Sequence, residues 1–162
     1  MPSLSGTFDP RIGPLITLFL TPPAVLRGAV QSSAAAAAQQ TPLSVHATIA
    51  LVDTGASITS VTAGLARQVA LPLIGKRPIG TAGGVVAANL YLADITFPFT
   101  ALPSGPVGQP LPPMNVAAAT IPNISVLEFQ YSSPHFQMLL GRDILCRGVF
   151  TMSFDNHFTL SL

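Results

Sequence analysis

One carboxylate in the chain stands where the surrounding residues predict chemistry. Asp53 ends an apolar run, residues 48–52, whose β-branched content predicts a buried strand. A carboxylate in that position is costly unless it finds hydrogen-bond donors, takes up a proton or takes part in a reaction. Thr54 and Ser57 supply hydroxyl groups, and Gly55 lets the backbone turn tightly enough to bring its N–H near the carboxylate. The sequence therefore predicts a loop that presents Asp53 for acid–base chemistry.

A second segment, far downstream, carries two apolar residues, a glycine and a charged pair. It reads Leu139-Leu140-Gly141-Arg142-Asp143 and is expected to open a short helix. Together with Leu51-Val52-Asp53-Thr54-Gly55-Ala56-Ser57, it resembles the retropepsins, the single-domain aspartic peptidases that include the retroviral proteases. The resemblance covers roughly residues 43–162.

The resemblance implies a fold, an assembly and a reaction. The fold would be all-β, a closed, barrel-like retropepsin fold with a flap hairpin and one short C-terminal helix, assembled as a homodimer. The reaction would be hydrolysis of a polypeptide substrate by an aspartic endopeptidase, through a water molecule activated by two Asp53 carboxylates, one from each subunit. As in aspartic proteases generally, like charges so close cannot both ionise, so the pair would share one proton.

The resemblance also implies roles for individual residues. Asp53 would be the catalytic acid and base, Thr54 would brace the two loops across the dimer, and Gly55 would contact the substrate or the other loop. The residues expected to bind substrate are Leu51, Ala56, Ser57, Gly83, Gly84 and Leu139. Ser57 stands where retroviral proteases often have a further acid, so the substrate hydrogen bonds of those enzymes are not carried over to it.

Two strand-like runs in residues 79–86 and 88–97 flank a glycine-rich tip, which predicts a hairpin. In the resembled family, the flap that closes over the substrate lies at this place in the order of elements. Glycine at 83 and 84 would permit positive φ and let backbone lie close to a bound peptide. An ordinary hairpin turn is the alternative.

Composition narrows the remaining function classes. Charged residues make up only 8% of the 162 residues and the net charge is +1, with no Lys/Arg cluster, which argues against nucleic acid as a partner. No His, Cys or acidic residues stand at metal-site spacing, so neither a metal nor another cofactor is expected. The apolar stretch 15–20 is too short to insert stably in a membrane. Because no convincing secretion signal is present, a cytoplasmic location is expected by default.

The chain is expected to form a single domain over residues 1–162. Within it, residues 1–13 are predicted to be an irregular leader, and residues 25–42 a flexible insertion, with a short helix as the alternative. Residues 98–123 are rich in proline and predict an extended surface loop.

The C-terminal residues predict a hairpin with one apolar face. Its members alternate along two strands: Phe150, Met152, Phe154, Phe158, Leu160 and Leu162. A three-residue connection through 155–157 would place all six on one face. By the resemblance, residues 158–162, with Ile16 to Leu20, would form a sheet with the partner subunit. A hairpin packed on its own core is the alternative.

A second function remains open from the sequence, a catalytically silent peptide-binding or assembly module with the same fold. The discriminating observation is whether Asp53→Asn abolishes cleavage of a denatured protein.

Overall fold

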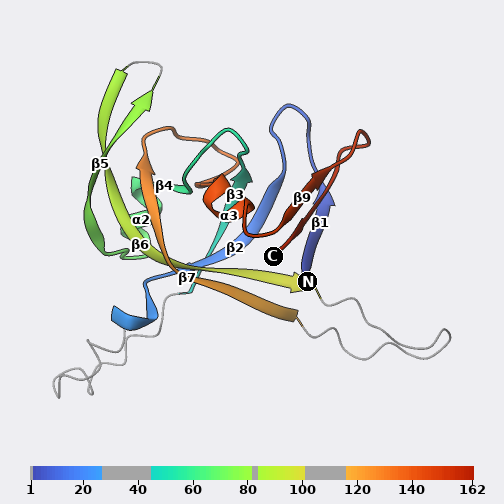
Figure 1. The fold of residues 1–162 in the computed structure, drawn as a ribbon, viewed down its shortest axis with the longest axis horizontal. Helices are drawn as coiled ribbons and strands as arrows, with labels where there is room; N and C mark the ends of the chain where they lie inside the picture. The colour runs from blue at the N-terminus through green and yellow to red at the C-terminus, as the bar shows by residue number, and fades with distance from the viewer. Residues whose placement is uncertain (1, 27–44, 82–83, 101–115) are drawn as a thin grey trace.

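The structure is a computed structural model, and it describes residues 2–26, 45–81, 84–100 and 116–162 (Figure 1). Strands dominate these residues, and the helices are few and short. The strands are β1 (Ser3–Thr7), β2 (Leu15–Thr21), β3 (His46–Val52), β4 (Ser60–Thr62), β5 (Leu73–Thr81), β6 (Gly84–Thr100), β7 (Val116–Phe129), β8 (Met138–Leu140), β9 (Val149–Met152) and β10 (His157–Ser161). The helices α2 (Ala63–Gln68) and α3 (Arg142–Leu145) lie between them. None of the helices in the described residues is long and apolar enough to cross a membrane.

Six strands close into a barrel, which confirms the predicted all-β, barrel-like architecture. Their order around the barrel is β2, β3, β8, β4, β7 and β6, and β6 returns to β2 through three residue pairs around Leu20 and Ile95. The pairs β3–β8 and β4–β7 are parallel, and the other neighbours are antiparallel. Because closure removes free edges, all six strands have a neighbour on each side over part of their length.

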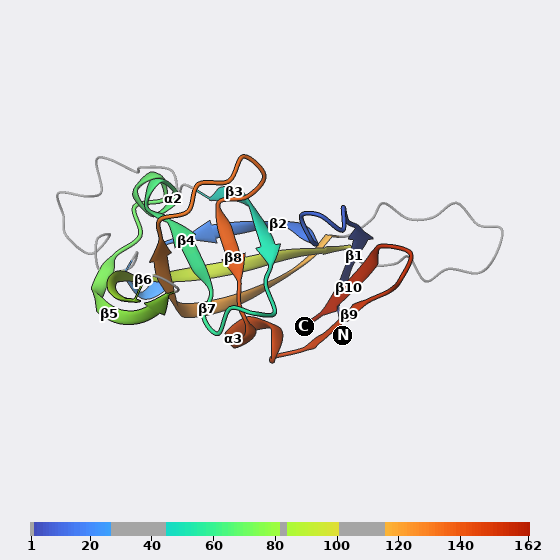
Figure 2. The same ribbon diagram turned by 90° about the horizontal axis from the view of Figure 1, so that it is seen from above.

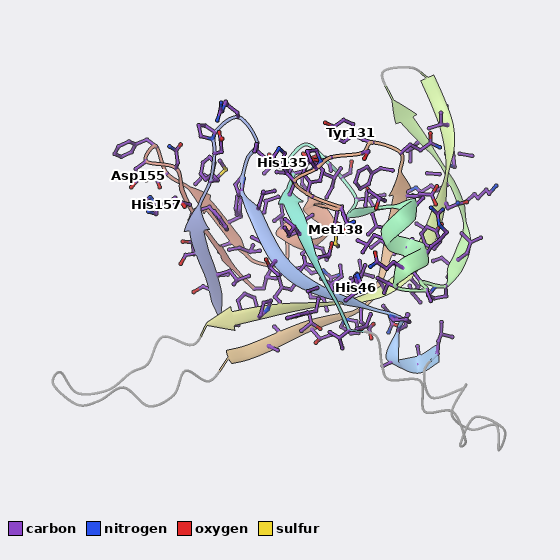
Figure 3. All side chains as sticks on the ribbon, turned by 180° about the vertical axis from the view of Figure 1, so that it is seen from behind. His46, Tyr131, His135, Met138, Asp155 and His157 are labelled. Carbon is purple, nitrogen blue, oxygen red and sulfur yellow. The ribbon has the colours of Figure 1, made fainter. Side chains whose placement is uncertain are left out.

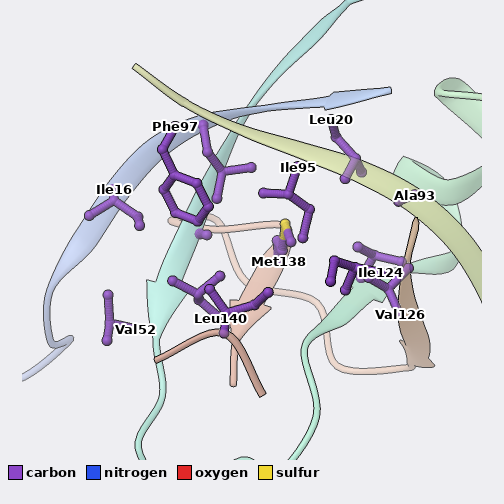
Figure 4. Packing of buried hydrophobic residues seen from close by; sticks show 14 of the residues in the cluster. Ile16, Leu20, Val52, Ala93, Ile95, Phe97, Ile124, Val126, Met138 and Leu140 are labelled. Carbon is purple, nitrogen blue, oxygen red and sulfur yellow. The ribbon is translucent and has the colours of Figure 1, made fainter. Parts of the chain in front are cut away.

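Side chains that alternate along the strands fill the barrel. In β2, Ile16, Leu18 and Leu20 are buried while Thr17 between them is exposed. The same period of two brings residues from five strands into one interior, shown in Figure 4: Ile16, Leu20, Val52, Ala93, Ile95, Phe97, Ile124, Val126, Met138 and Leu140. The inward residues of β3 and β8 therefore serve the core, and their neighbours in sequence point outward.

The predicted hairpin is confirmed. Strands β5 and β6 pair antiparallel from Leu73 with Tyr91 to Thr81 with Gly84, and the hairpin projects beyond the barrel (Figure 1). Gly84 has a φ of +114°, a conformation that glycine adopts without strain.

The predicted irregular leader is wrong for residues 3–7. They form β1, which pairs with β10 from Ser3 with Ser161 to Thr7 with His157. Two serines and a glycine among its five residues give β1 little intrinsic strand preference, so the strand depends on the partner that supplies its hydrogen bonds.

Both segments of the predicted interface sheet pair with strands of their own chain. Residues 16–20 belong to β2, a barrel strand that pairs with both β3 and β6. Strand β10 is the middle of a three-stranded sheet with order β1-β10-β9, so both of its edges are already paired within one chain. In the described chain β10 thus has no unpaired edge and β2 pairs with β6 only over residues 19–21, while the C-terminal hairpin packs on its own core as in the alternative.

The register of that hairpin differs from the prediction by two residues. Phe158 pairs with Met152 and Leu160 with Phe150, and Ser153 N donates to His157 O at 2.9 Å. Because a shift of two keeps the face, these four apolar residues still share one side of the sheet. Phe154 instead lies in the turn, fully exposed.

The proline-rich loop is shorter than predicted. Strand β6 continues through Pro98 to Thr100, and β7 begins at Val116 and includes Pro122. Beyond Thr96, β6 pairs only with β7 in the described chain, and proline is tolerated where its missing N–H faces an unpaired side. Most of the predicted insertion at 25–42, namely 27–42, lies outside the described residues.

Candidate active site

The end of β3 fixes the backbone at Asp53. Strand β3 lies between β2 and β8. Val52 N donates to Pro14 O at 2.9 Å, and Asp53 N donates to Leu140 O at 3.0 Å. The chain is thus held on both sides immediately before it leaves the barrel, and the half-buried Asp53 begins the loop to β4.

Two backbone N–H groups hold the carboxylate of Asp53. Its Oδ1 accepts from Gly55 N at 2.9 Å and from Ala56 N at 3.2 Å. A Cβ on Gly55 would lie 3.1 Å from that same oxygen, so a side chain there would crowd the carboxylate. Within the described residues, Oδ2 receives no hydrogen bond from the protein. One oxygen is therefore positioned by the loop, and the other is available to a ligand or solvent.

A second set of contacts ties this loop to α3, 84 residues further on. Thr59 is fully buried, and its Oγ1 donates to Asp143 Oδ1 at 2.7 Å and accepts from Gly141 N at 3.1 Å. Thr59 N donates to the same Asp143 oxygen at 3.0 Å. Arg142 N adds a bond to Ala56 O at 2.9 Å. We call Thr59, Gly141 and Asp143 the loop anchor, because together they fix the loop against the start of α3.

Gly141 is required by contact with backbone. A Cβ built there would lie 2.6 Å from Ile58 C, 2.8 Å from Thr59 N and 2.9 Å from Ile58 O. None of these atoms can rotate away, so only glycine fits this crossing. The expected helix after Gly141 is confirmed as α3, whose first-turn Asp143 also accepts from Ile144 N at 3.0 Å.

Sequence reasoning assigned no role to Thr59. The residue lies in the stretch after Asp53, but its partners are distant in sequence, and no local pattern marks the pairing. The contact between Thr59 and the start of α3 arises because β4 pairs with β8, with Ser60 opposite Leu139.

Some of the residues predicted to bind substrate lie at the Asp53 loop, and others lie on the β5–β6 hairpin. Leu51 and Leu139 are paired across β3 and β8 and half-buried on the outer face, directly before the loop. Ala56 is half-buried on the loop, and Thr54 and Ser57 are exposed. Gly84 begins β6, and the hairpin of β5 and β6 extends to the same side of the barrel as the β3–β4 loop in Figure 1. Gly83 lies outside the described residues.

A polar cluster joins the base of that hairpin to the barrel. Glu128 Oε2 of β7 accepts from Tyr91 Oη at 2.6 Å and from Asn89 Nδ2 at 3.0 Å, both on β6. The bond from Tyr91, followed by that from Asn89, lowers the pKa of Glu128. Burial, and then the hydrogen bond to Glu128, raises the pKa of Tyr91. At neutral pH the cluster is thus an anionic acceptor with two donors, which ties β6 to β7 below the hairpin.

A Ser–Asp–His group occurs at the β9–β10 turn, where Figure 3 shows Asp155 and His157 at the tip of the hairpin, away from the barrel. Asp155 accepts from Ser153 Oγ and lies 3.1 Å from His157 Nδ1, and the Ser153 bond lowers the pKa of Asp155. Because the serine bonds the aspartate and not the imidazole, it lacks the base that activates a nucleophile. Across the described residues, no three His, Cys, Asp or Glu side chains gather as metal ligands.

Comparison with protein-family models, curated proteins and solved structures finds no match to this chain.

Proposed function

We propose that this chain is a homodimeric aspartic endopeptidase, with Asp53 of each subunit as the catalytic group. The observation that carries the proposal is the Asp53 carboxylate at the end of a barrel strand, with Oδ1 bound by two loop N–H groups and Oδ2 unbonded within the described chain. Such an arrangement gives the carboxylate a fixed position while leaving an oxygen to act on water.

Counting the acids supports a second subunit. The chain has six acidic residues, all within the described parts. The five besides Asp53 have partners of their own: Asp9 with Arg11, Asp94 with the N–H groups of Ala24 and Asn123, Glu128 with Tyr91, Asp143 with Thr59, and Asp155 with Ser153. A second carboxylate for the reaction therefore comes from another copy of the chain.

The edge strand β9 offers a surface for that copy. It pairs with β10 on one side only in the described chain, and Val149 and Met152 are 55% and 51% exposed. Figure 2 shows β9, α3 and the β3–β4 loop along the same side of the molecule. Antiparallel pairing of β9 with the β9 of a second copy would be isologous, the arrangement of most homodimers. This surface replaces the strand interleaving expected from the family.

The reaction needs a water molecule between the two carboxylates. The ionised carboxylate takes a proton from the water molecule as the water oxygen attacks the peptide carbonyl carbon. The protonated carboxyl donates its proton to the carbonyl oxygen. The carboxyl that took the water's proton then gives it to the nitrogen as the C–N bond breaks, while a hydroxyl of the tetrahedral intermediate returns its proton to the other carboxylate and becomes the product carbonyl. With Leu51 and Leu139 beside the loop, apolar side chains next to the cut bond are favoured.

Hydrolysis of reduced, carboxymethylated casein tests this function. Asp53→Asn keeps the side-chain shape and removes the acid and base, so cleavage should fall by about 10²–10⁴-fold. Asp155→Asn, on an exposed turn, is the matched control and should keep full activity. Cleavage by Asp53→Asn at the wild-type rate would refute the peptidase mechanism. Binding of casein without any cleavage by the wild-type protein would favour the silent binding module.

A further inference from the structure

A depression in the described surface lies on the outer face of β2 and β3. It has a volume of about 480 Å³ and is lined by Thr17, residues 47–49 and residues 133–137. That volume falls in the range of about 300–1,000 Å³ typical of ligand sites. No Asp, Glu, Lys or Arg lines it, so its occupant need carry no charge. We call this depression the outer groove.

Unpaired backbone lies at the outer groove. Val52 N bonds to Pro14 O, so in β3 the even-numbered residues direct their backbone groups to β2, and Ala47, Ile49 and Leu51 direct theirs toward β8. Strand β8 begins at Met138, opposite Ala50, and Gln137 N reaches only Ile49 O, at 3.1 Å. In the described chain, the N–H and C=O of Ala47 therefore have no strand to pair with.

The outer groove is continuous with the candidate active site along one sheet face. Ala47, Ile49 and Leu51 alternate outward on β3, and Ile49 is 44% exposed. Leu51 is next to Leu139 and immediately precedes the Asp53 loop. The connection that carries His135 and Tyr131, labelled in Figure 3, forms the opposite wall.

We propose that the outer groove binds an extended, uncharged segment of the polypeptide substrate as an added strand on the Ala47 edge. An unpaired edge provides main-chain hydrogen bonds to any extended peptide, and the neighbouring side chains select among sequences. The proposal rests on the proposed peptidase function and names its substrate class, a polypeptide ordered well beyond the cut bond.

The spacing sets the length of that substrate. Ala47 precedes Asp53 by six residues, or about 20 Å at about 3.3 Å per residue of strand. An extended peptide covers a similar distance per residue. The segment in the outer groove is therefore about six residues from the cut bond, on one side of it.

Trimming a substrate tests this spacing. A peptide of about 20 residues that wild-type protein cleaves is taken from a casein digest and shortened one residue at a time from each end. We expect KM to rise about tenfold when one end is cut to within about six residues of the cut bond, with kcat unchanged. Trimming that has no such step at either end would overturn the proposal.

Two variants locate the effect. Ala47→Pro removes the outward N–H without touching the β2 ladder, and Ala47→Val keeps that N–H. We expect the proline variant to raise KM about tenfold for the long peptide only, and the valine variant to behave as wild type. Equal changes for long and short peptides, or no change with Ala47→Pro, would refute the groove assignment.

A binding measurement separates this proposal from the proposed function. If the wild-type protein cleaves casein, binding of the labelled 20-residue peptide is measured by fluorescence anisotropy in the Asp53→Asn background. If it cleaves nothing, binding of labelled carboxymethylated casein is measured without that substitution. Weaker binding by Ala47→Pro than by Ala47→Val supports the groove in either case. Equal binding by the two variants contradicts it, whether or not the chain is a peptidase.

Discussion

Replacing Gly141 by alanine should damage the protein far more than one added methyl group normally does. The new Cβ would lie 2.6–2.9 Å from three backbone atoms of Ile58 and Thr59. Overpacking of a buried site commonly costs about 1–3 kcal/mol, and the upper end applies here because backbone cannot rotate away. Any shift also weakens the 3.1 Å bond from Gly141 N to Thr59 Oγ1, a contribution of about 1 kcal/mol. We therefore expect a loss of about 3–4 kcal/mol.

Gly64 provides the matched control for Gly141. It is exposed in α2, and a Cβ there would meet nothing closer than Thr62 Oγ1 at 4.0 Å. Alanine in a helix is favoured over glycine by about 1 kcal/mol, so Gly64→Ala should stabilise the protein slightly.

Urea unfolding at one fixed protein concentration measures both variants, since association would shift the midpoint. With a slope of about 2 kcal/mol per M, Gly141→Ala should lower the midpoint by about 1.5–2 M. A Gly141→Ala midpoint within about 0.3 M of wild type would refute the idea that the loop and α3 cross in direct backbone contact.

The hydrogen bonds of Thr59 and Glu128 and the open edge of β9 can each be tested by substitution. Thr59→Val keeps the side-chain shape but leaves Asp143 and Gly141 without their hydroxyl partner. It should lower the free energy of unfolding in urea by about 1–3 kcal/mol and reduce casein cleavage. Thr7→Val, on an exposed strand, should change neither, and equal effects of the two variants would contradict the loop anchor. Because the folded pKa of Glu128 is lowered, its stabilisation is present above the unfolded value of about 4.3 and is lost as pH falls through the folded pKa. Wild type should thus be more stable than Glu128→Gln at pH 7, and that advantage should be smaller at pH 3; an advantage that is the same at both pH values would count against the cluster. Because Ser153 N donates to His157 O, the N–H of the neighbouring Met152 points to the open edge of β9. Met152→Pro removes that N–H and should sediment as a monomer, whereas Met152→Thr should remain a dimer. A dimeric Met152→Pro protein would rule out pairing along β9.

Local patterns were sufficient to predict the elements that carry the site. The apolar run before Asp53 is β3, the glycine-rich region is the β5–β6 hairpin, and the residues after Gly141 form α3. Each of these depends on neighbours in sequence, where periodicity and turn chemistry operate.

The features that sequence could not provide depend on distant partners. Strand β1 has little strand preference of its own and exists because β10 pairs with it. The hairpin register differs by two residues because the turn includes Phe154, and either register keeps the apolar face. Thr59 and Asp143 meet only because the barrel brings β4 beside β8. Long-range pairing of this kind leaves no periodic signal in a single sequence.

The central claim is that one active unit contains two Asp53 carboxylates, and mixing wild-type with Asp53→Asn protein tests it most directly. Equal amounts of the two proteins are allowed to exchange subunits. Casein cleavage by the mixture is then compared with cleavage by wild-type protein alone at the same total chain concentration. If both carboxylates are needed, only dimers of two wild-type chains are active, and about one quarter of the activity should remain. Retention of about one half would mean that each wild-type chain acts with its own Asp53 alone, which would contradict the account.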